Sequence, residues 1–77
     1  MNKARRKAIE EIIDQLGDLK EQVELLSEEE QEAIDNLPES IQYSERGESM
    51  SENVSDLDDA ASSIDEIIDT LQGIIER

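Results

Sequence analysis

Several residue types that usually carry chemistry are absent from this chain of 77 residues. There is no Cys, which excludes disulfide bonds and thiolate metal sites, and no His, which excludes the usual zinc ligand and general base. Phe and Trp are also missing, so a core must be built from Ile, Leu, Val and Ala. The remaining residues form no constellation that identifies a reaction. We therefore expect no enzymatic activity, no cofactor and no bound metal.

Long apolar runs are absent too. No stretch approaches the roughly 20 apolar residues that are needed to span a bilayer. The basic start of the chain is followed by Glu10, Glu11 and Asp14 rather than by the apolar region of a signal peptide. The sequence thus predicts a soluble, unprocessed protein with no membrane partner, and the lack of Cys fits a reducing cytoplasm.

Positive charge is scarce, because seven Lys and Arg residues oppose 22 Asp and Glu residues and give a formal net charge of −15. Between residues 8 and 76, all 22 carboxylates are set against only Lys20 and Arg46, a net of −20. This field repels nucleic acids and attracts basic surfaces. We expect a basic protein partner and no direct nucleic-acid binding, although solvation alone would explain the charge equally well. Four basic residues form a basic cluster at the start of the chain: Lys3, Arg5, Arg6 and Lys7.

The first half of the chain has the spacing of a long helix. After a possible N-cap at Asn2, apolar residues recur three and four apart, which is a heptad pattern typical of a helix packed along one seam. The pattern predicts one helix over about 3–36. A break at Ser27 is the alternative, because Ser27 and Glu30 have the spacing of a capping box. The predicted seam consists of Ile9, Ile12, Leu16, Leu19, Val23 and Leu26.

The second half repeats this pattern after a hinge at about 37–48. Pro38 should end the first helix, Gly47 can take a positive φ at the reversal, and a capping box of Ser49 and Glu52 predicts a helix over about 50–76. The predicted fold is therefore all-α, an antiparallel helical hairpin in a single domain of residues 1–77, with a short third helix possible at the hinge. The second seam consists of Met50, Val54, Leu57, Ala61, Ile64, Ile68, Leu71 and Ile75.

A third apolar row on the second helix predicts self-association. One partner helix needs only two rows of a heptad, so the additional row, together with Ile13 and Ile34, indicates a second contact surface. We expect a homo-oligomer, a hairpin that dimerises into a four-helix bundle. The third row consists of Ala60, Ile67 and Ile74.

An internal echo makes the hairpin prediction more specific. Residues 9–16 and 64–71 both begin with the run Ile-acid-Glu-Ile-Ile-Asp, and we expect the two segments to face each other. This pairing would place the basic cluster beside Asp65, Asp69 and Glu76, where it would be neutralised within the chain. The acids of these runs could also hold a divalent metal, as paired acidic helices do in all-α nucleotide pyrophosphatases. The basic residues and the extended acidic pattern of such sites are missing, so no metal site is predicted.

Two groups of residues are candidates for binding. Clustered acids on the two helices could bind a basic partner: Glu28, Glu29, Glu32, Asp56, Asp58 and Asp59. Hinge residues could bind an anionic nucleotide once oligomerisation brings several hinges together, with Tyr stacking on a base and Arg pairing with phosphate: Tyr43, Ser44, Arg46 and Gly47.

The hinge also carries a resemblance. At Asp35-Asn36-Leu37-Pro38-Glu39-Ser40 and Ser44-Glu45-Arg46-Gly47-Glu48 the chain resembles small, acidic, helical proteins encoded by phages and prophages of Gram-positive bacteria, and the likeness covers the whole length. It implies a small accessory protein in the cytoplasm of a bacterial host, of the kind that occupies a host protein such as a defence factor. Three functions stay open: a binding protein with a surface that mimics nucleic acid, a structural or assembly oligomer, and a sponge for an anionic nucleotide signal.

Overall fold

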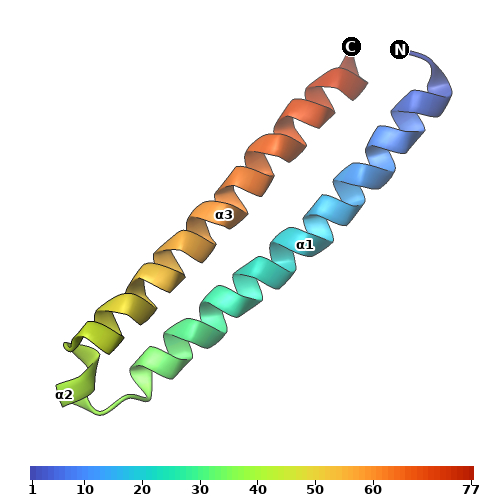
Figure 1. Cartoon of the computed structure of the whole chain (residues 1–77). Coiled ribbons are helices and arrows are strands. Elements are labelled where there is room, and N and C mark those ends of the chain that lie inside the picture. Colours follow the sequence, from blue (N-terminus) through green and yellow to red (C-terminus); the bar gives the residue numbers. More distant parts are fainter.

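Two long antiparallel helices make up almost the whole chain. The computed structural model describes residues 1–77 as α1 (Lys3–Asp35), α2 (Glu39–Gln42) and α3 (Glu45–Glu76). α1 and α3 lie side by side with both chain termini at one end, and α2 closes the other end (Figure 1). The molecule is a rod of 59 × 15 × 12 Å. The predicted all-α fold with a long helical hairpin is thus confirmed. None of the helices has the length and apolar character needed to cross a membrane.

α1 begins and ends where its sequence signals predict. The side chain of Asn2 accepts a hydrogen bond of 2.8 Å from the backbone N–H of Arg5, which satisfies a free donor of the first turn. The helix runs without a break past Ser27, so the alternative of a separate helix beginning there is wrong. It ends at Asp35, two residues before Leu37, because Pro38 disfavours helical geometry at the residue that precedes it.

α3 begins at Glu45 rather than near Met50, because Ser44 takes the extended conformation of an N-cap residue and acidic residues follow it in the first turn. Negative charge is favourable at this end of a helix. Ser49 lies inside α3 and does not cap it. The prediction for Gly47 was also wrong, since no glycine in the chain has a positive φ. Gly47 is buried in the first turn of α3 instead, and a Cβ there would lie 2.0 Å from the carbonyl oxygen of Gln42.

The seam of α3 contains the predicted residues, but the seam of α1 is rotated. Ile12, Leu19 and Leu26 were expected to face α3, yet they are 46%, 50% and 53% exposed. The residues that follow each of them are better shielded and take their place, so that Ile13 and Ile34 belong to the seam instead of flanking it. The observed α1 seam consists of Ile9, Ile13, Leu16, Lys20, Val23, Ser27, Glu30 and Ile34.

The core between the helices is thin. Ile34 and Ala61 are the only buried hydrophobic residues, at 8% and 5% exposure, and no large side chain is fully buried. A hairpin of two helices leaves most seam residues open on at least one side. Tertiary packing supplies most of the stability of helices in proteins, so a single copy of this hairpin is poorly stabilised.

Candidate functional site

Three polar contacts across the seam fix how α1 and α3 are aligned. The hydroxyl of Ser27 donates a hydrogen bond of 2.6 Å to Asp58, and Ser27 itself is buried. The ammonium group of Lys20 lies 2.7 Å from a carboxylate oxygen of Asp65. Nearer the hinge, the side-chain amide of Asn53 donates a hydrogen bond of 2.9 Å to Glu30. The polar residues of the α1 seam therefore each have a partner on α3, which explains why this rotation of α1 is tolerated.

Lys20 lies between two carboxylates that stabilise its charged form. Its hydrogen bond with Asp65 raises the pKa of the Lys20 ammonium group, and Glu24 at 3.4 Å acts in the same direction, while desolvation opposes both. The positive charge of Lys20 is thus already held by two carboxylates of the same chain. It does little to offset the remaining acids around it.

The observed alignment contradicts the expected pairing of residues 9–16 with residues 64–71. That pairing would place Ile13 opposite Ile67, but Ile13 instead lines a shallow hollow with Gln72 and Ile75. Residues 9–16 and 64–71 are therefore displaced along the rod, relative to the expected pairing, by more than one helical turn. The shift arises because Lys20 and Ser27 contact Asp65 and Asp58, which lie further towards the C-terminal end of α3 than the residues that the expected pairing would place opposite them.

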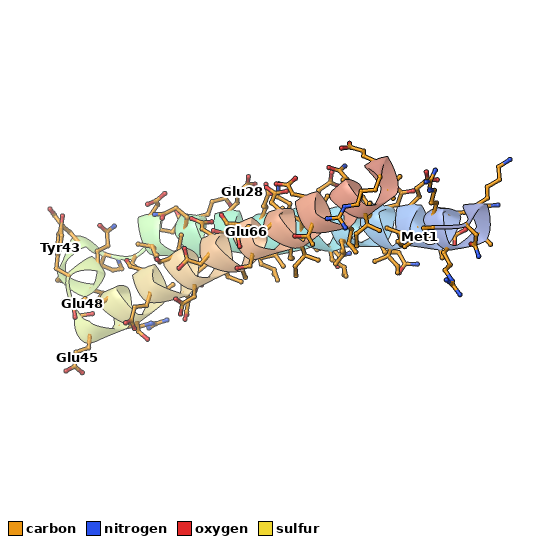
Figure 2. All side chains as sticks on the ribbon, turned by 90° about the horizontal axis from the view of Figure 1, so that it is seen from above. Met1, Glu28, Tyr43, Glu45, Glu48 and Glu66 are labelled. Carbon is orange, nitrogen blue, oxygen red and sulfur yellow. The ribbon has the colours of Figure 1, made fainter.

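The basic cluster is consequently not neutralised within the chain. All ion pairs of the protein involve Lys20, and none involves the cluster. The N-terminal turns of α1 extend beyond the C-terminal end of α3 (Figure 2), and no residue of the cluster forms an ion pair with the expected neighbours Asp65, Asp69 and Glu76. The Nε atom of Arg6 is shielded from solvent without a hydrogen-bond acceptor. The cluster thus forms a free positive end on an otherwise acidic molecule.

One side of the seam carries an apolar strip. The three residues displaced from the α1 seam each directly precede a seam residue, and so do the three residues of the third row on α3. Antiparallel helices are related by a two-fold axis, so equivalent heptad positions lie on the same side of the seam. The two rows therefore form one strip along the rod. The apolar strip consists of Ile12, Leu19, Leu26, Ala60, Ile67 and Ile74.

The opposite side of the seam is an acidic face. There the two helices present carboxylates at the heptad positions that directly follow seam positions, just as the apolar strip occupies positions that directly precede them. The hollow described above lies on this side, and Glu10, Asp14 and Glu76 line it from both helices. The acidic face consists of Glu10, Asp14, Glu21, Glu24, Glu28, Asp35, Glu48, Asp58, Asp65, Asp69 and Glu76.

The acids singled out from the sequence do not share one direction. Consecutive helical residues are rotated by about 100°, so Glu28 belongs to the acidic face whereas Glu29 points towards the side of the apolar strip. Asp56 is on that side too, while Glu32 and Asp59 lie on the outer edges of the rod. Asp58 is on the acidic face and accepts the hydrogen bond from Ser27. Grouping the acids by closeness in sequence therefore does not identify the acidic face, whereas grouping them by heptad position does.

The hinge residues do not converge in a single chain. Tyr43 is 80% exposed and lies at the far end of the rod (Figure 2). The hydroxyl of Ser44 donates a hydrogen bond to the carbonyl oxygen of Ile41, so it is engaged within the hinge. The backbone of Gly47 is covered by that of Gln42, and Arg46 is exposed. None of these residues lines a hollow of the molecule.

The carboxylates nowhere gather into a group with the geometry of a metal site. Comparison of the chain with protein-family models, with curated proteins and with solved structures gives no match. The surfaces described above are therefore the basis for a functional proposal.

Proposed function

We propose that the protein is an accessory binding protein that covers a basic surface of another protein with its acidic face. The observation that carries this proposal is the gathering of half of the carboxylates, from both helices, on one side of the seam. The only cation on that side of the paired region is Lys20, which Asp65 and Glu24 already hold. The face is therefore free to attract positive charge.

The acidic face can stand in for a nucleic acid only in part. Its carboxylates recur on average about every 8 Å along α1 and about every 10 Å along α3, because six of them lie between residues 10 and 35, five lie between residues 48 and 76, and each residue rises about 1.5 Å. Duplex DNA carries about one charge per 1.7 Å of its axis, so it is the denser polyanion. Nucleic acid should consequently compete well for any basic surface that the protein covers.

The setting of this activity is the one that the resemblance implies. Small acidic proteins of phages are suited to occupy a host protein that normally binds nucleic acid, and a defence factor of a bacterial host is the target that we propose. No catalytic step is needed, because occupation of the basic surface is itself the effect. The site residues are those of the acidic face, with Glu21 and Glu28 at its centre on α1.

The experiment captures a partner from a lysate of a Gram-positive host, identifies it by mass and measures its association with the purified protein. Association should be fast, should weaken steeply as salt rises from about 50 to about 500 mM, and should be competed by duplex DNA. Glu28→Lys should slow association several-fold. Glu29→Lys is the matched control, because it makes the same change of charge on the neighbouring residue, about 100° away around the helix.

Two results would remove the proposal: binding that is insensitive to salt, or equal effects of the two variants. If binding instead depends on Tyr43 or Arg46, the hinge is the site. The assembly alternative keeps one observation in its favour, the apolar strip. It requires that the protein retain no partner at all.

A further inference from the structure

We propose that a second copy of this chain packs on the apolar strip, with the two hairpins antiparallel, and that the pair is a four-helix bundle. The proposal does not depend on the acidic face or on its target. It assigns the strip to self-association and leaves the acidic face open on the outside of the assembly.

The first support is the thin core of a single copy. Only two hydrophobic residues are buried and the other seam residues stay partly exposed, so packing within one copy offers little to offset the chain entropy lost in ordering helices of 33 and 32 residues. Leu19, Leu26 and Ile67 are half exposed, at 50%, 53% and 50%. A second hairpin on the strip would bury these side chains and also close one open side of the seam.

The second support is the charge of the strip side. Although the chain has a net charge of −15, the strip and the row beside it carry only the acids Glu29 and Asp56. The heptad position that forms the strip is occupied by Arg5 at the start of α1 and by Arg46 at the start of α3, which lie at opposite ends of the rod. Gln15, Gln22, Ser63 and Thr70 make up most of the remaining border. Two copies can therefore approach on this side while most of their carboxylates point away from each other, which no other side of the rod allows.

The third support is size. The rod measures 59 Å by 15 Å, so a second copy seated along the strip would cover about 800 Å² on each protomer, which is the standard area of a stable interface. The apolar core with neutral polar borders also has the composition of such interfaces.

The distribution of charge along the rod selects the antiparallel arrangement. The basic cluster is at one end, where it extends past α3, and acids such as Glu39 and Glu45 are at the hinge end (Figures 1 and 2). Parallel hairpins would bring the two basic clusters together. Antiparallel hairpins place each basic cluster beside the hinge of the second copy, where carboxylates could accept the hydrogen bond that Arg6 lacks.

This arrangement predicts a specific alignment. A two-fold axis between Leu19 and Leu26 is the one that sets the basic cluster opposite residues 38–42 at the hinge of the second copy. It packs α1 against the α1 of the second copy, with Leu19 facing Leu26. Gln22 lies almost on this axis and therefore faces its own copy. Gln15 occupies the same heptad position two turns away and faces the region of residue 30 in the second copy.

The first test is sedimentation equilibrium of the full chain with a charge placed on the strip. The parent protein should be a dimer at tens of micromolar, and Ile67→Glu should weaken dimerisation at least tenfold. Ser62→Glu, which adds the same charge to an exposed position on the acidic side, should weaken it much less. Association should also tighten as salt rises, because salt screens the repulsion between two molecules of charge −15. Binding to a basic target has the opposite salt dependence, so the two proposals fail separately.

The second test is oxidative cross-linking, which the absence of natural Cys makes simple. Gln22→Cys should form a disulfide-linked dimer rapidly, and Gln15→Cys should not. A monomer at these concentrations, or equal effects of Ile67→Glu and Ser62→Glu, overturns the role of the strip. A dimer that cross-links equally at both positions, or at neither, overturns the antiparallel packing of α1 on α1.

Discussion

The three glycines offer a sharp test of the hinge, because the same substitution should act in opposite directions along one chain. All three lie in helices, where Gly is less favourable than Ala by about 0.5 to 1 kcal/mol. An added Cβ has nothing within 4 Å at Gly17 or Gly73. Gly17→Ala and Gly73→Ala should therefore each stabilise the protein by about that amount.

Gly47→Ala should destabilise instead. The new Cβ would lie 2.0 Å from the carbonyl oxygen of Gln42 and 2.7 Å from that of Ile41, and both obstacles are backbone atoms that cannot rotate away. The backbone of α2 would have to retreat by about 1 Å, and overpacking of this kind costs about 1 to 3 kcal/mol. Since this cost offsets the gain in helix propensity, we expect a net loss of about 1 to 2 kcal/mol.

Thermal unfolding followed by circular dichroism measures the effect, with all variants at one protein concentration because self-association contributes to stability. The midpoints of the Gly47→Ala and Gly17→Ala variants should differ by about 6 to 24 °C, since their stabilities should differ by about 1.5 to 3 kcal/mol and each kcal/mol shifts the midpoint by about 4 to 8 °C in a domain of this size. A Gly47→Ala protein that is as stable as the Gly17→Ala protein would show that α2 does not pack on the first turn of α3.

Further predictions concern the seam. Ile34→Ala should destabilise by about 2 to 4 kcal/mol, because Ile34 is the best-shielded large side chain, while Glu32→Ala on the outer edge should stay within about 0.5 kcal/mol in urea unfolding. Because the pKa of Lys20 is raised in the folded state, the stability from its pairing with Asp65 is fully present below its ordinary value of 10.5 and is lost as pH rises through the raised value. The unfolding midpoint should therefore fall more between about pH 9 and about pH 11.5 in the parent than in Lys20→Met, and equal falls would contradict this role.

The sequence was sufficient for the fold and for one of the two seams. On α3 the heptad positions that face α1 are apolar throughout, from Met50 to Ile75, so only one rotation of that helix buries an apolar row. On α1 two rows compete, since Ile12, Leu19 and Leu26 are more apolar than the observed Ile13, Lys20 and Ser27. Hydrophobicity alone favours the wrong row. The observed rotation depends on partners on the other helix, Asp58 and Asp65, which a pattern within α1 cannot reveal.

The surfaces were predictable only in part for the same reason. The third row of α3 is visible in the sequence, whereas the matching half of the apolar strip on α1 appears only once the rotation of α1 is known. Acidic residues were grouped by closeness in sequence, which separates Glu28 from its neighbours in space and joins it to Glu29. The start of α3 was missed because Gly47 was interpreted by its freedom of φ, although its lack of a Cβ is what the hinge requires.

The regular heptad spacing of both seams has a consequence for the shape of any target. A repeat of 3.5 residues is slightly shorter than a helical turn, so the two helices wind around each other with a left-handed twist. At a pitch of about 150 Å, each surface of the rod rotates by roughly a third of a circle over the length of α1. The strands of B-form DNA wind in the opposite sense and complete a turn in about 34 Å. The acidic face can therefore follow a groove shaped for DNA over only a fraction of a turn, and a protein that it covers should present a short basic patch rather than a long curved channel.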